Sequence, residues 1–391
     1  MIECIIVIID NYMPLLDTLL LKTASRCNLD CTYCYVYQGA DQSWKEQPYN
    51  MSDEVISTVI HRIIQFSHKQ DTGFAIVLHG GEPLLLGYPK LKKLLSGLRS
   101  GLNESKYPIS IQTNGALLNK KILDICAFYK VSISVSLDGS RKANDIARFT
   151  RGGKSSHDSV MAGINLLQTH PESDFLFAGT LSVVQTSVPA HETYNFLKSV
   201  ATPSIDFLFQ DGNHSRMPFG KKSFQSTEYG EWLSDIFNLY INDPDPVPIK
   251  ILDDLIKLTL GGSTSKEGKG EHEFGILVIE SDGEIRKNDT LRASFEGVDY
   301  FIGRPTIFKN SIESIINTDE FLDYVKNPKI IAKECSNCQI SHICGGGMPL
   351  YRWSETNGFN NPSVYCSDHK FIINNIIDFV KEYEKERAFN G

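Results

Sequence analysis

Short apolar, β-branched runs alternate with longer amphipathic stretches from about Asp17 to Leu260. The short runs are often apolar throughout, which is typical of parallel strands covered by helices. The longer stretches repeat their apolar positions at helical spacing. We therefore predict strands at Thr18–Thr23, Phe74–His79, Ile109–Thr113, Val131–Leu137, Phe177–Val184 and Ile205–Gln210, and helices at Asp53–Ser67, Tyr88–Leu102, Leu118–Tyr129, Asp158–Gln168 and His191–Val200.

These strand–helix units predict an α/β fold, a parallel sheet curved into a partial (βα)6 barrel. In such barrels the chemistry lies at the carboxyl ends of the strands. Candidate motifs fall at those ends: a cysteine loop after the first strand, then His79–Pro83, Gln112–Gly115 and Ser136–Gly139 after the next three. The sequence thus predicts one site at this edge of the sheet.

The composition changes after the predicted barrel. Residues 261–270, GGSTSKEGKG, are rich in glycine and serine, which predicts a flexible linker. A hairpin is predicted at Phe274–Ile285, and a long helix runs from about His369 to Arg387. The predicted parts are an N-terminal segment (1–16), the barrel (17–260), the linker (261–270), a cysteine-containing extension (271–368) and a C-terminal helix (369–391).

The composition of the 391 residues is that of an ordinary globular chain, with 41% hydrophobic and 22% charged residues. The net charge of −8 argues against a nucleic-acid partner, which usually selects a basic surface. No run of eighteen or more apolar residues predicts a membrane span, and no signal peptide precedes the barrel. We therefore expect a cytoplasmic protein without a membrane partner.

Nine cysteines are present, an odd number, and most of them gather in two windows far apart in the chain. Without a secretion signal, this pattern favours metal-binding thiolates in a reducing cytosol over disulfides. Cys4 and Cys126 lie in apolar segments, and we expect them to be buried structural thiols.

The first window has the spacing C-x3-C-x2-C, formed by Cys27, Cys31 and Cys34. Three thiolates on one loop can ligate three irons of a cubane and leave the fourth open to a small molecule. The second window and a later cysteine supply Cys335, Cys338, Cys344 and Cys366. From spacing alone, either set could hold zinc instead of an iron–sulfur cluster.

The cysteine loop together with Gly80-Gly81-Glu82-Pro83 resembles the radical S-adenosylmethionine (SAM) superfamily. The resemblance implies that SAM binds the open iron and yields a 5′-deoxyadenosyl radical. It also implies that Gly80, Gly81 and Glu82 bind the SAM ammonium group. The remaining SAM-site candidates are Tyr35 after the third cysteine, Ser136 at the ribose hydroxyls and Arg148 at the SAM carboxylate; a turn-capping serine and a surface ion-pair arginine are the alternatives.

The second cysteine set resembles the SPASM extension of peptide-modifying radical SAM enzymes. This sequence departs from the SPASM pattern, because Met348 and Asn288 occupy two cysteine positions. In the family these two belong to the first auxiliary cluster, while the four remaining cysteines are the full ligand set of the second. The resemblance therefore implies two [4Fe–4S] clusters, and the auxiliary one serves electron transfer or holds the extension folded.

A SPASM extension implies a ribosomally made precursor peptide as substrate and an external one-electron donor of the flavodoxin or ferredoxin type. The segments 278–291 and 206–214 resemble maturases of the Xye, Grr and Fxs type. We therefore predict a cyclophane crosslink from a substrate Cβ to an aromatic side chain. The alternatives are thioether formation or epimerisation of a peptide, anaerobic sulfatase maturation by formylglycine formation, and a non-catalytic metal scaffold.

Asp289 is the candidate catalytic residue. It directly follows Asn288, and in related SPASM enzymes an aspartate at this place acts as a base. A carboxylate within hydrogen-bond reach can accept the proton that oxidation releases. An ordinary turn aspartate that bonds to its own backbone is the alternative.

Overall fold

The computed structural model describes residues 16–264, 266–326 and 332–390, with side chains described up to residue 386. The predicted segment 1–16, with Cys4, therefore lies outside the described residues apart from Leu16. Among the described residues, no helix combines the length and apolar character needed to cross a membrane.

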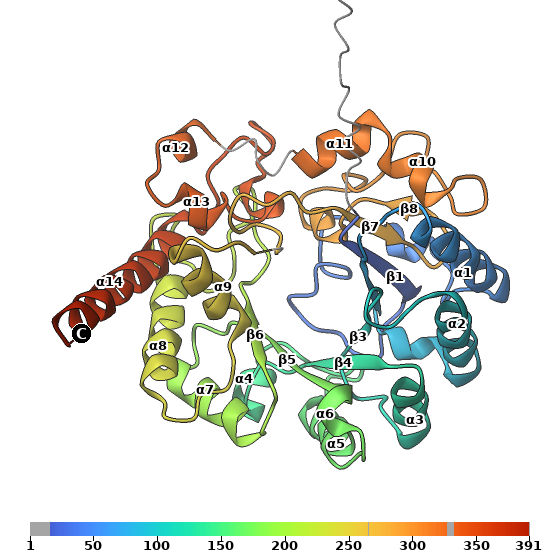
Figure 1. Cartoon of the computed structure of the whole chain (residues 1–391), viewed down its shortest axis with the longest axis horizontal. Helices are drawn as coiled ribbons and strands as arrows, with labels where there is room; N and C mark the ends of the chain where they lie inside the picture. Colours follow the sequence, from blue (N-terminus) through green and yellow to red (C-terminus); the bar gives the residue numbers. More distant parts are fainter. Residues whose placement is uncertain (1–15, 265, 327–331, 391) are drawn as a thin grey trace, which may run out of the picture.

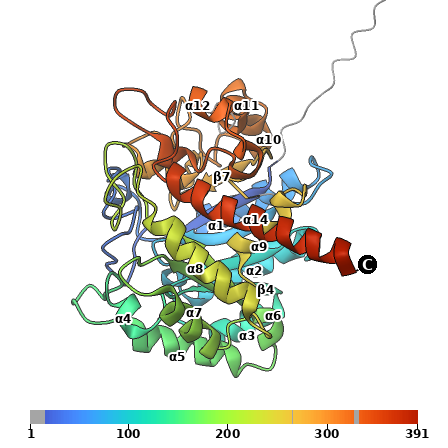
Figure 2. The same cartoon turned by 90° about the vertical axis from the view of Figure 1, so that its left-hand side faces the viewer.

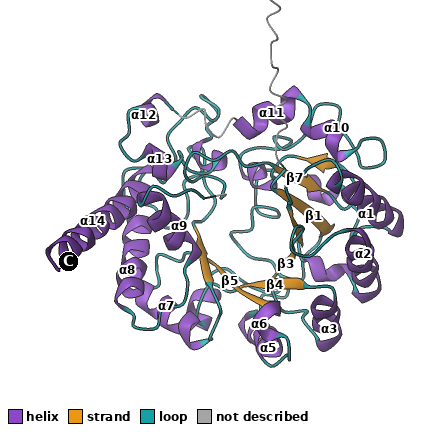
Figure 3. Cartoon of the chain, in the orientation of Figure 1, coloured by secondary structure: helices purple, strands orange, loops and turns teal. Residues whose placement is uncertain are grey.

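One curved sheet forms the centre of the molecule, and helices lie along its outer side (Figures 1 and 3). Its strand order is β6-β5-β4-β3-β2-β1-β7-β8, and the first six strands along the chain are parallel. These strands are β1 (Thr18–Ala24), β2 (Ala75–Gly80), β3 (Ile109–Thr113), β4 (Val131–Ser136), β5 (Phe177–Val183) and β6 (Ile205–Leu208). The predicted partial barrel is confirmed, and each predicted strand ends within a few residues of the observed one.

The predicted helices are confirmed with similar accuracy. They are α1 (Asp53–Ser67), α2 (Tyr88–Gly101), α3 (Lys120–Phe128), α5 (His157–Gln168) and α7 (Ala190–Ser199). In α1, for example, the Ser52 hydroxyl caps the helix by accepting a hydrogen bond from Val55 N, and Ile56, Val59 and Ile63 are fully buried against the sheet.

Further helices and 3-10 turns complete the described structure. The remaining helices are α4 (Arg141–Asn144), α6 (Ser173–Leu176), α8 (Glu228–Asn242), α9 (Lys250–Thr259), α10 (Ile312–Ile316), α11 (Asp319–Lys326), α12 (Lys333–Ser336), α13 (Ser341–Cys344) and α14 (Cys366–Asn390), with 3-10 turns η1 (Ser43–Lys45), η2 (Pro83–Leu86), η3 (Asp289–Ala293) and η5 (Pro349–Arg352). The C-terminal helix α14 runs beside α8 (Figure 2). Asp368 fixes this contact, because its carboxylate accepts hydrogen bonds from Tyr229 N and Gly230 N at the start of α8.

The predicted hairpin is present, but it belongs to the barrel sheet. Strand β7 (Ile276–Ile279) pairs in parallel with β1, and β8 (Ile285–Arg286) pairs antiparallel with β7. All four residues of β7 are buried. By pairing with β1, strand β7 satisfies the backbone N–H and C=O groups that β1 would otherwise leave unpaired at the edge of the barrel sheet. The hairpin thereby brings η3 to the carboxyl end of β1.

The predicted linker 261–270 is packed rather than free where the structure describes it. Lys266 Nζ lies 2.5 Å from Asp206 Oδ2 on β6. Gly268 lies against Met348 so closely that an added Cβ would be 2.7 Å from Met348 N. Charged side chains and a close backbone approach therefore fix a segment whose composition alone predicts flexibility.

Candidate active site

The three cysteines of the first window line a cavity of about 290 Å³, called the inner cavity below. Arg151 holds their loop, because its Nε donates a hydrogen bond to the Cys27 carbonyl at 2.7 Å. Burial raises the pKa of Cys27 to about 12 and that of Cys34 to about 11. These thiols therefore become thiolates only when a bound cation compensates their charge, as iron does.

Gly80, Gly81, Ser136 and Arg148 line the same cavity, so the structure brings these predicted SAM contacts together with the cysteines. Ser136 Oγ accepts a hydrogen bond from Gln112 Nε2 at 2.9 Å. Gly81 leaves no room for a side chain, because an added Cβ would collide with the Tyr37 hydroxyl and with the Arg26 carbonyl oxygen.

Arg148 is buried, so the exposed ion-pair alternative is wrong. Its Nη1 donates to the Tyr33 hydroxyl at 2.8 Å, and that hydroxyl donates to Asp138 Oδ2, also at 2.8 Å. Its Nε has no hydrogen-bond partner among the described residues, although the atom is buried. A buried guanidinium with an unsatisfied N–H fits an anionic ligand in the inner cavity, such as a carboxylate.

Glu82 is the predicted contact that does not reach the cavity. Its carboxylate accepts hydrogen bonds from Thr113 Oγ1 at 2.6 Å and from Asn114 N at 2.9 Å, and the side chain is fully buried. It holds the turn after β3 in place. Asn114, from the candidate motif Gln112–Gly115, does line the cavity, and its Nδ2 lies 3.7 Å from Cys27 Sγ.

Asp289 lies at the start of η3 beside the cysteine loop. Its Oδ2 accepts a hydrogen bond from the Tyr35 hydroxyl at 2.6 Å and forms an ion pair with Lys22 of β1. Burial alone would raise the pKa of this carboxyl, but Lys22 and His79 hold it below its usual range. Asp289 is therefore an anion in the folded protein. Its other oxygen, Oδ1, makes no hydrogen bond with any residue the structure describes.

Two further candidate functional residues, Lys22 and Asp211, were not predicted from the sequence. Lys22 is a charged residue within an apolar strand and is only 2% exposed, which was a usable signal of a buried ion pair. Asp211 follows β6 and lines the inner cavity, but nothing in the local sequence separates it from an ordinary turn aspartate.

The four cysteines of the extension come together from α12, the loop after it, α13 and the start of α14. Burial, followed by the neighbouring thiols, raises the pKa of Cys344 to about 12. Its Sγ lies 3.5 Å from His369 Nδ1. In the part of the chain that the structure describes, no three or more His, Cys, Asp or Glu side chains are grouped to hold a single metal ion. The donors fit a polynuclear thiolate-ligated cluster. Cys126 is buried, as predicted.

The two positions at which cysteines are missing from the SPASM pattern lie near one another. Asn288 Nδ2 donates to Glu267 Oε2 at 2.5 Å, and Met348 packs against Gly268 beside that glutamate. Burial raises the pKa of Glu267 to about 7. A hydrogen-bonded side-chain pair thus occupies the space between these positions.

Comparison with known proteins identifies the fold. Residues 21–176 match the radical SAM superfamily. The chain is 24% identical over 366 residues to a cysteine-type anaerobic sulfatase-maturating enzyme of Clostridium perfringens, covering 92% of this chain and 95% of that enzyme. It is 25% identical over 382 residues to a serine-type enzyme of Bacteroides thetaiotaomicron, covering 92% and 89%.

Solved structures agree. The structure of anSMEcpe with bound AdoMet and the Cp18Cys peptide superimposes with a TM-score of 0.79 at 22% identity, covering 96% of this chain and 100% of that one. Streptococcus suis SuiB bound to its precursor peptide SuiA gives 0.59 at 14% identity, covering 86% and 72%. The chain therefore has a radical SAM domain with a C-terminal extension, which agrees with the predicted cofactors, SAM and two [4Fe–4S] clusters.

These comparisons overturn the predicted cyclophane crosslink. Relatives that match nearly the full chain include sulfatase-maturating enzymes of both the cysteine and the serine type. Anaerobic sulfatase maturation, given above as an alternative to the crosslink, agrees better with these relatives.

Proposed function

We propose that this radical SAM protein oxidises a cysteine or serine side chain of a peptide substrate to an aldehyde, as in anaerobic sulfatase maturation. The observation that carries the proposal is the full-length similarity to enzymes of this type. The inner cavity supports it, because the radical-generating cysteines, candidate SAM contacts and Tyr35 with its partner Asp289 meet at one place.

When bound, SAM and the iron–sulfur clusters would supply the radical that removes one hydrogen atom from the substrate Cβ and the acceptor for the one electron that oxidation releases. The substrate must also lose one proton, from its S–H or O–H group. A serine then becomes the aldehyde directly. A cysteine becomes a thioaldehyde, which water converts to the aldehyde with release of hydrogen sulfide. The protein's own task is to bind both reactants and to take up the proton.

Binding of SAM falls to groups already on the cavity wall. Arg148 lines the cavity, and its guanidinium would pair with the carboxylate of SAM. Ser136 and the backbone of Gly80 and Gly81 offer hydrogen-bonding groups to the remainder of the molecule. Glu82 acts indirectly in this proposal, since it fixes the turn that carries Asn114.

Proton uptake falls to Asp289. Lys22 keeps its carboxylate ionised, and Oδ1 remains available to accept a proton. The role follows the aspartate of related enzymes, although Asp289 itself is only 2% exposed in the absence of substrate.

The substitution Asp289→Asn tests this assignment. With a substrate deuterated at Cβ, the variant should still transfer deuterium into 5′-deoxyadenosine, whereas aldehyde formation should fall by about 10²-fold. Asp235→Asn, an exposed change on α8, is the matched control and should behave as wild type. Wild-type yields of aldehyde from Asp289→Asn would remove Asp289 from the mechanism.

A further inference from the structure

A second cavity of about 370 Å³, called the outer pocket below, adjoins the inner cavity. Tyr33, Gln210 and Asp211 line both. Met217 and Phe219 line the outer pocket and are 40% and 66% exposed, so the pocket lies at the molecular surface. Together the two cavities form a path from the cysteine loop to solvent.

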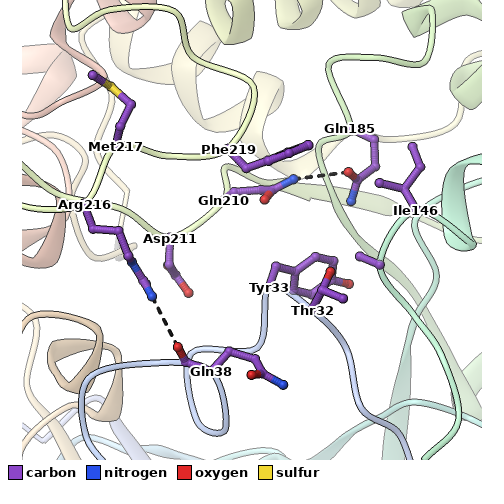
Figure 4. A pocket seen from close by; sticks show the side chains of 11 residues that line it. Thr32, Tyr33, Gln38, Ile146, Gln185, Gln210, Asp211, Arg216, Met217 and Phe219 are labelled. Carbon is purple, nitrogen blue, oxygen red and sulfur yellow. Dashed lines mark hydrogen bonds between the residues drawn. The ribbon is translucent and has the colours of Figure 1, made fainter. Parts of the chain in front are cut away.

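Asp211 is the one carboxylate among the described residues lining either cavity. In Figure 4 its side chain points into the outer pocket between Arg216 and Tyr33. Its neighbours are paired elsewhere: Gln210 Nε2 donates to Gln185 Oε1 at 3.2 Å, and Arg216 Nη1 donates to the Gln38 carbonyl at 3.4 Å. The Asp211 carboxylate itself makes no hydrogen bond or ion pair with any described residue.

The charges around Asp211 set its proton affinity. Burial and the nearby anion Asp289 raise the pKa of Asp211, Arg216 lowers it, and the result is about 7. The other titratable groups whose pKa responds to Asp211 are hydroxyls that stay protonated at neutral pH, those of Tyr35, Tyr229, Tyr351 and Tyr365. Asp211 therefore exchanges protons at neutral pH, whereas Asp289 has little affinity for one.

This difference matters because the proposed reaction releases one proton per turnover into a buried site. Asp289 cannot retain that proton, since Lys22 favours its ionised form. A proton moves spontaneously to a nearby group of higher affinity. Asp211 is such a group, and it is in addition open to the outer pocket.

We propose that Asp211 receives the substrate's proton from Asp289 and releases it to solvent through the outer pocket. The proposal rests on the proposed function and adds a residue to it. The balance is simple: the S–H or O–H proton passes to Asp289, then to Asp211, then to water, and no electron moves in these steps. Each carboxylate is ionised again before the next substrate binds.

The test is the pH dependence of aldehyde formation by the reconstituted enzyme with SAM and a cysteine peptide. For wild type, the rate should rise as the pH increases through about 7, because only ionised Asp211 accepts a proton. Asp211→Asn should lower the rate about tenfold or more and abolish this rise. Asp211→Glu should keep both the rate and the rise, and Asp235→Asn should match wild type.

An infrared titration supplies a readout that needs no turnover. In substrate-free enzyme, a protonated carboxyl band that disappears as the pH passes about 7 should be equally strong in wild type and Asp235→Asn and weaker in Asp211→Asn, where Glu267 still contributes to it. If that band is undiminished in Asp211→Asn, or if this variant changes only KM and keeps the pH dependence, the proposal is wrong. Failure of wild type to form any aldehyde would instead overturn the proposed function itself.

Discussion

At the residue scale, the ion pair between Lys22 and Asp289 is the most consequential contact of the site. Both side chains are 3% exposed. Removing one member of a buried pair leaves the other charge without compensation, at a cost of about 3–5 kcal/mol. The pair joins β1 to η3, so its loss also loosens the attachment of η3, which carries the predicted proton acceptor.

We predict that Lys22→Met destabilises the protein by about 3 kcal/mol at neutral pH. Because Lys22 depresses the pKa of Asp289, the lost stabilisation belongs to the ionised carboxyl, so the deficit should shrink as the pH falls below about 4, where unfolded aspartates become protonated. Anaerobic denaturant unfolding at several pH values measures it. The double variant Lys22→Met/Asp289→Asn should recover part of the loss; equal deficits at all pH values would show that the ion pair contributes nothing.

At the element scale, the site could be predicted wherever a local pattern carried the information. Apolar runs gave strands β1 to β6, and the cysteine spacing placed one loop at the carboxyl end of β1. The contacts that close the site join residues far apart in the chain, such as Tyr35 and Asp289, separated by 254 positions. The pairing of β7 with β1 creates that contact, and no periodicity within either strand encodes it. Asp211 could not be predicted for the same reason, whereas Lys22, a charged residue within an apolar strand, carries a local signal.

The two cysteine elements should behave independently. Changing Cys27, Cys31 and Cys34 to Ala removes all three thiolates of the loop after β1, while Cys335, Cys338, Cys344 and Cys366 lie on other elements. We therefore predict that the triple variant folds, retains about half of the wild-type iron and sulfide, and no longer cleaves SAM. Metal and sulfide analysis with 5′-deoxyadenosine assays measures this. Loss of all iron would show that the two sites do not assemble separately.

At the scale of the whole molecule, the fold predicted from the sequence is confirmed, whereas the predicted reaction, a cyclophane crosslink, is wrong. Fold and cysteine chemistry follow from patterns that one sequence displays. Substrate class depends on the cavity as a whole, and two absent cysteines are weak evidence about it, since Asn288 and Glu267 fill that space with a hydrogen bond of their own. The similarity to a sulfatase-maturating enzyme extends over 92% of the chain, so it is better evidence about the cavity as a whole.

The chemical identity of the product tests the central claim most directly. Reconstituted enzyme, SAM and a one-electron reductant should be incubated with three peptides that differ only in carrying Cys, Ser or Ala at one position, and the products trapped with a hydrazine and analysed by mass spectrometry. The proposed function predicts a trapped aldehyde from the Cys peptide, the Ser peptide or both, and none from the Ala peptide. Before trapping, the aldehyde formed from the Ser peptide should be lighter than that peptide by two hydrogens. Cleavage of SAM with no aldehyde from either, or a product of unchanged mass, would contradict it.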